Sequence, residues 1–232
     1  PDMLAELRRA PAAVRRLAAR PAREAIDLAR AAMVTRDRSL EAFSFADERD
    51  AWLVDDGDGL AFVLAGVIPE RRHAIASYFG GLTLRNGVPI GYHQADLVGA
   101  SAALSFNTFE TFRGGEAAFT FARWLAALHH VFGATSFSVE PYQLGKDNDE
   151  GLASGAWWFY AKLGFRPRHK ATLALAQQEI ERAQRRPRHR TTPATLRRLA
   201  GRHVFLDLEP AHPRPLIPLA ALGMCSGAAL SP

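Results

Sequence analysis

The sequence predicts an α/β (α+β) fold in which helices flank a mixed sheet. Three observations predict it: strand-like segments dominate residues 51–109, an amphipathic helix follows, and a strand, a second helix and further strand-like residues come after it. A run of strands that then alternates with helices is typical of a sheet covered by helices. The 232 residues suffice for one medium domain, and 48% hydrophobic with 23% charged residues argues against wholesale disorder.

The amino-terminal segment is rich in Ala, Leu and Arg. Apolar residues recur there at helical spacing over residues 2–33, and Pro11 and Pro21 are expected to divide it into two or three short helices. We interpret residues 1–45 as a helical extension that packs against a main domain at 46–209. A basic helix that binds nucleic acid or a membrane surface, or one that binds a partner protein, is the alternative.

The strand-like segments are separated by recognisable turns. Residues 52–54 and 60–68 flank a cluster of Asp and Gly, and residues 69–79 form either a helix or an irregular crossing. Asn86-Gly87 tolerates positive φ at both positions, so it predicts a tight hairpin between its flanking strands. Residues 102–109 alternate apolar and polar side chains and predict a further strand.

The clearest helix is predicted at residues 113–132. Its apolar stripe repeats at steps of 4, 3 and 4 residues and consists of Phe121, Leu125, Leu128 and Phe132. Gly133 ends this helix, and a strand at 135–139 follows.

Downstream, the order of elements continues with shorter segments. The pattern predicts helices at 152–163 and 173–186, the first ended by Gly164, and a strand at 203–208. Residues 210–232 are rich in proline and predict an extended or disordered tail.

Composition excludes several classes of protein. The single cysteine, Cys225, allows neither an internal disulfide nor a Cys-based zinc site. There is no run of 18 apolar residues and no apolar leader at the amino end, so we expect a cytoplasmic protein without a membrane span.

A net charge of +5 weakly favours an anionic ligand, either cofactor phosphates or nucleic acid. The basic run at 182–190 is interpreted as solvated surface, which makes nucleic acid the less favoured partner.

The first candidate for chemistry is the segment 113–118, Arg-Gly-Gly-Glu-Ala-Ala, which joins a strand to the long helix. Paired glycines let the backbone approach a ligand closely, and the N–H groups of a first helical turn favour an anion. The segment lacks the lysine of a phosphate-binding P-loop and does not fit G-x-G-x-x-G. An ordinary glycine-rich turn is the alternative.

The second candidate is the segment 154–167, an amphipathic helix with a glycine stop. Tyr160 is the titratable group on its inner face, and its hydroxyl is able to donate a proton. A structural tyrosine hydrogen-bonded to the backbone is the alternative.

The pair His129-His130 and the acidic loop 147–150 lack the spacing of metal sites, so no metal is predicted. The loop is expected to cap a helix or to line an acceptor pocket.

Together, and separated by one strand, the two segments resemble the GNAT superfamily of acyl-CoA-dependent N-acyltransferases. Ala156, Tyr160 and Gly164-Phe165 are similar to the family's Ala-x-x-x-Tyr-x-x-x-Gly-Phe signature. Residues 113–118 resemble its Gln/Arg-x-x-Gly-x-Gly/Ala pyrophosphate loop, with Glu116 at the middle glycine or, in a register one residue earlier, without the leading Gln/Arg. The element order is similar over 52–208, and it implies a mostly antiparallel mixed sheet.

The resemblance also implies roles for individual residues. Tyr160 would protonate the departing coenzyme A thiolate, and a base for the amine would sit at a strand end, at Glu110 or Glu140. Acetyl-CoA or another acyl-CoA would be the co-substrate, and an unidentified amine the acceptor. The residues expected to bind the co-substrate are those of the splayed strand and the loop: Asn107, Thr108, Phe109, Arg113, Gly114, Gly115, Glu116 and Ala117.

Two departures from the family pattern favour a second hypothesis. Glu116 would put a carboxylate beside a pyrophosphate, and Ala153 stands where the family commonly has asparagine. The alternative function is therefore a catalytically inactive GNAT-like module that binds coenzyme A or a protein.

Overall fold

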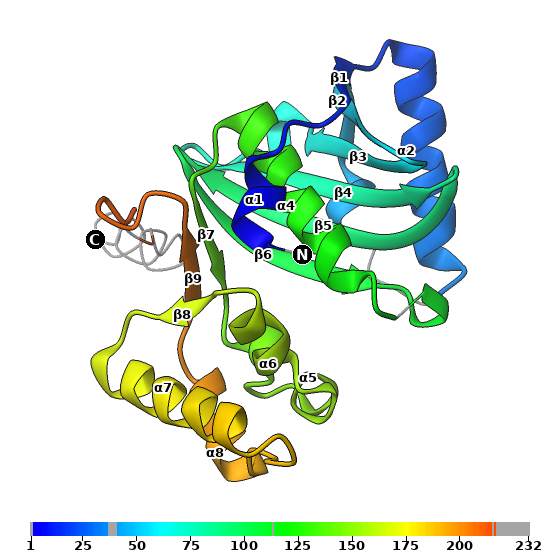
Figure 1. Cartoon of the computed structure of the whole chain (residues 1–232). Coiled ribbons are helices and arrows are strands. Elements are labelled where there is room, and N and C mark those ends of the chain that lie inside the picture. The colour runs from blue at the N-terminus through cyan, green and yellow to red at the C-terminus, as the bar shows by residue number, and fades with distance from the viewer. Residues whose placement is uncertain (1, 37–40, 113, 215, 217–232) are drawn as a thin grey trace, which may run out of the picture.

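The computed structural model describes residues 2–36, 41–112, 114–214 and 216. Its centre is a nine-stranded sheet in the order β1-β2-β3-β4-β5-β6-β7-β9-β8 (Figure 1). Neighbouring strands run antiparallel, with the exception of β6 and β7, which are parallel. The prediction of a mixed α/β fold with a mostly antiparallel sheet is confirmed.

The elements have the following bounds. The strands are β1 (Ala13–Arg16), β2 (Ala46–Gly57), β3 (Leu60–Val67), β4 (Ser77–Arg85), β5 (Val88–Val98), β6 (Ser101–Thr108), β7 (Ser136–Val139), β8 (Arg166–Pro167) and β9 (Val204–Asp207). The α-helices are α1 (Met3–Arg8), α2 (Ala19–Val34), α3 (Glu41–Ser44), α4 (Ala117–Phe132), α5 (Asp149–Ser154), α6 (Ala156–Lys162), α7 (Lys170–Arg185) and α8 (Pro193–Ala200). Short 3₁₀ turns are η1 (Pro69–Arg71), η2 (Glu110–Phe112) and η3 (Tyr142–Leu144).

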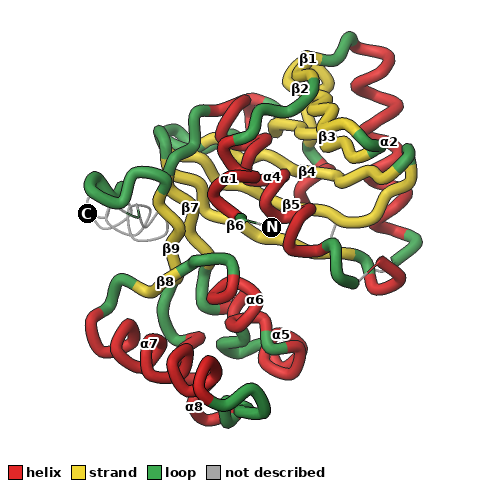
Figure 2. The backbone as a smooth tube through the Cα atoms, in the orientation of Figure 1, coloured by secondary structure: helices red, strands yellow, loops and turns green. Residues whose placement is uncertain are grey.

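Helices cover both faces of the sheet, as the tube view shows (Figure 2). On one face α1 and α4 pack over the central strands, and on the other α2 and α3 do so. Strand β3 divides its side chains accordingly, because Phe62 and Leu64 join the core under α4, whereas Val63 and Ala65 join the core under α2. This burial on both faces explains the nearly continuous apolar run of β3.

The predicted hairpin is confirmed. Asn86 and Gly87 join β4 to β5 with φ angles of 50° and 79°, the left-handed values that a type I′ turn needs. The long helix is confirmed as α4, although it begins at Ala117 rather than at residue 113, and Gly133 ends it with a φ of 71°.

The amino-terminal segment is not wholly helical, so that part of the prediction was wrong. Residues Ala13–Arg16 form the edge strand β1, which pairs with Trp52–Asp55 of β2. Pro21 does not divide a helix, because it is the third residue of α2, where a backbone N–H has no partner within the helix. Pro11 does separate α1 from β1.

Other differences lie in the carboxy-terminal half. The helix predicted at 152–163 is two helices, since Gly155 adopts a φ of 70° and lies between α5 and α6. Strand β8 and helix α8, which Thr192 caps, were not predicted. Most of the predicted tail at 210–232 lies outside the described residues, and the boundaries at 45 and 209 stay predictions.

A buried ion pair joins the sheet to both helices of one face. The Arg123 side chain of α4 is fully buried, and its Nε lies 2.7 Å from Oδ2 of Asp56 in β2. The same guanidinium donates to the carbonyl oxygens of Glu6 and Arg9, the latter at 2.9 Å, which fixes the end of α1 against α4. A buried charge pair of this kind is costly to break, because removal of one partner leaves the other charge without compensation.

We therefore expect Arg123→Met to lower the free energy of unfolding by about 3–5 kcal/mol, measured by urea denaturation. The matched control is Arg20→Ala, which breaks the exposed Arg20–Glu24 pair and is expected to change stability by no more than about 0.5 kcal/mol. Equal effects of the two substitutions would contradict this account of the fold.

Candidate functional site

Strand β6 continues past the end of its parallel neighbour. The two strands pair from Ser101–Leu104 to Ser136–Val139, where β7 ends, and β6 runs on to Thr108 bonded to β5 alone among the described strands. The chain after β7 turns away at Pro141 into η3. Over residues 105–107 the edge of β6 therefore carries backbone groups that no neighbouring strand of the described chain covers.

A cavity of about 350 Å³ opens at this edge, and we call it the strand-end cavity. Four parts of the chain line it: the end of β6, the start of α4 with the turn before it, η3, and α5 with α6. Its lining residues are Phe106, Asn107, Thr108, Gly114, Ala117, Gln143, Asn148, Glu150, Gly151, Ser154, Ala156, Phe159 and Tyr160. Four of the residues expected from the sequence to bind the co-substrate, together with Tyr160, are thus brought together.

Tyr160 lies on α6, and its side chain packs mainly against aromatic rings. Its ring makes edge contacts with Phe121 and Phe165, each with centroids 5.6 Å apart, and the residue is only 4% exposed. Burial raises the pKa of the Tyr160 hydroxyl, so the group stays protonated at neutral pH and is able to act as a hydrogen-bond or proton donor.

A second, polar cavity of about 540 Å³ adjoins the first on the face covered by α2 and α3, and we call it the polar cavity. The two cavities share residues of β6, of η3 and of the start of α5: Phe106, Asn107, Gln143, Asn148 and Glu150. Glu140, at the end of β7, lines the polar cavity, and so does Glu41 of α3. Burial raises the pKa of nearby Asp96, and repulsion from Glu140 contributes to that rise.

The start of α4 differs from what the sequence led us to expect. Gly114 and Ala117 line the strand-end cavity, but the Glu116 side chain turns to Arg85, with Oε2 3.1 Å from Nη2. Glu116 makes no side-chain hydrogen bond to the first helical turn. Its carboxylate therefore does not occupy the strand-end cavity.

The remaining expected residues lie elsewhere. Phe109 is buried on the opposite face of the sheet, where the Arg36 guanidinium stacks 4.3 Å from its ring centroid. Gly115 lines neither of these two cavities, and Glu110, which is exposed in η2, does not line them either. Arg113 lies outside the described residues. Asn148 caps α5 by accepting a 3.0 Å bond from the Gly151 N–H, so the expected helix cap is confirmed, and it also lines both cavities.

No family model matches this sequence, and no curated protein matches it at a significant level. Within the described part of the chain, no three His, Cys, Asp or Glu side chains are grouped so as to bind a metal. A search of the same residues finds no helix with the length and apolar character that a membrane span needs. The assignment of a function therefore depends on the geometry of the cavities.

Sequence patterns gave no sign of one buried group, His93. It lies in β5 beneath α4, is 1% exposed, and stacks on Phe106 with centroids 4.8 Å apart. Its Nε2 hydrogen-bonds the Thr83 hydroxyl, whereas Nδ1 is buried and has no hydrogen-bond partner among the described residues. Burial lowers the pKa of His93 to about 3, so the ring is neutral near pH 7.

The lowered pKa of His93 makes stability depend on pH. The unfolded chain takes up a proton at His93 as the pH falls through about 6.5, but the folded protein does so only near its own pKa, about 3. Stability is therefore lost as the pH falls across this window, and we expect His93 to contribute a loss of about 2 kcal/mol between pH 7 and pH 5.

The measurement is urea unfolding at both pH values for the wild type and for His93→Gln, which keeps a polar group near Thr83. The difference between the two pH dependences isolates His93, since the other titrating groups are common to both proteins. Identical pH dependences, or a His93 Cε1–H resonance that titrates near pH 6.5 in the folded protein, would contradict this expectation.

Proposed function

We propose that this chain is an acyl-CoA-dependent N-acyltransferase of the GNAT type, which transfers an acyl group from a thioester to an amine. One observation carries the proposal: a single cavity lies where β6 extends past β7, and it is bordered by the end of β6, the start of α4 and the Tyr160 side chain. These are the three groups that such a transfer needs, namely a backbone edge for the pantetheine arm, a helix start for the pyrophosphate and a proton donor for the thiolate.

The backbone supplies the binding contacts. Over residues 105–107 the outer edge of β6 offers N–H and C=O groups to an extended ligand, in the way that an added strand would pair. An N–H of this edge aimed at the thioester carbonyl would stabilise the negative charge that develops on its oxygen. The start of α4, with Ala117 and the preceding Gly114 on the cavity, favours the pyrophosphate through the N–H groups of its first turn and the helix dipole.

The position of Glu116 supports this proposal over an inactive module. A carboxylate at the pyrophosphate would weaken binding by repulsion. Because Glu116 pairs with Arg85 outside the strand-end cavity, that repulsion is reduced. The polar cavity, which adjoins from the opposite face of the sheet, is the proposed entry side for the amine.

The chemical step is an acyl transfer. The neutral amine nitrogen attacks the thioester carbonyl carbon, a C–N bond forms, and the C–S bond then breaks. The proton lost by the amine passes to Glu140, directly or through water, and the thiolate takes the Tyr160 proton. Burial raises the pKa of the Tyr160 hydroxyl, and it also raises that of a thiol held against it, so burial by itself does not oppose the transfer between them.

The first test is Tyr160→Phe. We expect kcat for thiol release from acetyl-CoA with an amine panel to fall by about 100-fold or more, with the Kd for coenzyme A little changed, because only the proton donor is removed. The matched control is Tyr78→Phe, which removes a buried hydroxyl that has no hydrogen-bond partner among the described residues and lies outside both the strand-end cavity and the polar cavity. Its activity should equal that of the wild type.

Calorimetry of the wild type with coenzyme A and acetyl-CoA separates the two hypotheses. Binding together with thiol release supports the transferase. Binding without thiol release from any acyl-CoA and amine tested would support an inactive module that binds coenzyme A. A well-folded protein that binds neither compound and releases no thiol would overturn the transferase and favour an inactive module that binds a protein.

The second test compares two exposed carboxylates at strand ends. Only Glu140 lines a cavity, so Glu140→Gln is expected to lower kcat/KM for the amine by about 100-fold, whereas Glu110→Gln should leave it unchanged. The loss at Glu140 should shrink as the pH rises, because more of the amine is then already deprotonated. Equal effects of the two substitutions would remove Glu140 from the mechanism.

A further inference from the structure

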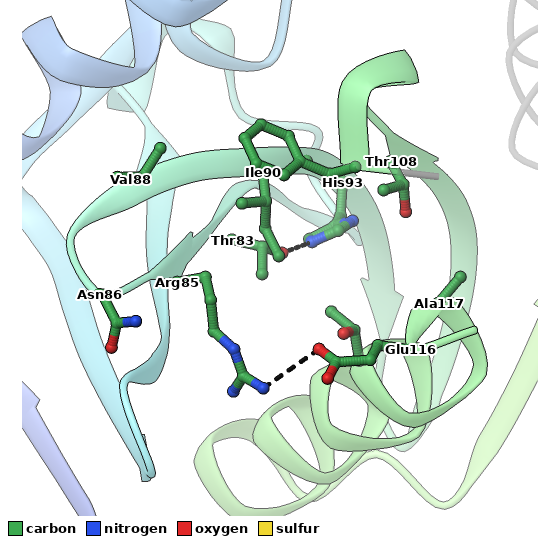
Figure 3. A pocket seen from close by; sticks show the side chains of 12 residues that line it. Thr83, Arg85, Asn86, Val88, Ile90, His93, Thr108, Glu116 and Ala117 are labelled. Atoms are coloured by element: carbon green, nitrogen blue, oxygen red, sulfur yellow. Dashed lines mark hydrogen bonds and ion pairs between the residues drawn. The ribbon is translucent and has the colours of Figure 1, made fainter. Parts of the chain in front are cut away.

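A third cavity, of about 260 Å³, lies between the β4–β5 hairpin and the start of α4 (Figure 3). Thr83 and His93 form its floor, and Val88, Ile90 and Phe112 are among its apolar lining residues. The ion pair of Arg85 and Glu116 lies on the side of the cavity toward α4 (Figure 3). We call it the His93 cavity. It is larger than the ~150 Å³ cavity that accommodates benzene in an engineered protein, so it has room for a small ring or branched chain.

We propose that the His93 cavity is a binding site for a small carboxylic acid with an apolar body, such as an aryl or branched-chain carboxylate. The proposed function does not use this cavity, which shares only Thr108 and Ala117 with the strand-end cavity. The proposal concerns binding alone and does not depend on the transferase activity.

The charge in the cavity selects the class of ligand. Arg85 donates to the Asp58 carbonyl at 3.3 Å and to the Glu116 carboxylate at 3.1 Å, so its guanidinium already holds one carboxylate (Figure 3). The Glu116 side chain is 73% exposed, and an ion pair with so exposed a partner contributes little to stability. A ligand carboxylate that replaces Glu116 would thus lose little in displacing it and would gain a charge-assisted hydrogen bond.

The interior of the cavity selects a small and mostly apolar body. Val88, Ile90 and Phe112 offer carbon surface. The uncharged polar groups beside it are the Asn86 amide, the neutral His93 ring and the hydroxyls of Thr83, Thr108 and Thr120. His93 is neutral because burial lowers its pKa, so it adds no second positive charge to the interior. A second carboxylate deep in the cavity would have no cation to pair with, which favours monocarboxylates over dicarboxylates.

The test uses benzoate and 3-methylbutanoate as probes, with benzamide and benzyl alcohol as neutral counterparts. Binding is measured by NMR titration of the full chain up to about 10 mM, the range in which small ligands of this size are detected. We expect the two carboxylates to bind, the neutral compounds to bind at least about tenfold more weakly, and the methyl resonances of Val88 and Ile90 to shift.

Two variants and a control make the result specific. Arg85→Gln should weaken benzoate binding by about tenfold or more, and Glu116→Gln should strengthen it several-fold by removing the competing carboxylate. Glu116 makes no capping bond, so its replacement leaves α4 intact. Arg20→Gln breaks an exposed Arg–Glu pair on α2, far from the cavity in sequence, and should leave binding unchanged.

Three outcomes would overturn the proposal. The first is equal binding of benzoate and benzamide, the second is binding that shifts Ala156 of the strand-end cavity but neither Val88 nor Ile90, and the third is no binding to a well-folded Glu116→Gln protein. Each of these outcomes is measured by NMR in the absence of acyl-CoA. The result therefore does not depend on whether the protein has the proposed transferase activity.

Discussion

The buried pair of Arg123 and Asp56 sets the position of α4, and much of the rest of the structure depends on that position. The Arg123 guanidinium donates hydrogen bonds to the Asp56 carboxylate in β2 and to two carbonyl oxygens of the amino-terminal segment. A charge with so many partners at zero exposure leaves α4 little freedom to slide or rotate over the sheet. An amino-terminal helix and a central helix, far apart in the chain, are thereby held as one layer.

Because α4 is fixed, its first turn is fixed too, and that turn borders two cavities. Ala117 lines both the strand-end cavity and the His93 cavity, while Glu116 extends from the same turn to Arg85. The residues of this turn therefore contribute to the surroundings of an anion bound in either cavity. The proposed acyl transfer uses one side of this turn, and the proposed carboxylate site uses the other.

The second constraint is the short pairing of the two parallel strands. β7 is held on both edges over Ser136–Val139, by β6 on one side and β9 on the other, and Pro141 follows within two residues. β6 is held along its whole length by β5, so it continues straight while the chain beyond β7 departs. The divergence is thus a consequence of unequal strand lengths. It gives the proposed site an edge that offers backbone groups beside two cavities that share lining residues.

The sequence by itself determined the features that depend on local chemistry. Asn86-Gly87 predicted a hairpin, the stripe from Phe121 to Phe132 predicted α4, and the spacing of Ala156 to Phe165 marked the helix that carries Tyr160. Only the tertiary structure decided that residues 13–16 form an edge strand, that Glu116 turns to Arg85, and that His93 lies beside a cavity. The physical reason is the same in each case: strand pairing, ion pairs and burial depend on partners from distant parts of the chain, and no local pattern records which partner will be near.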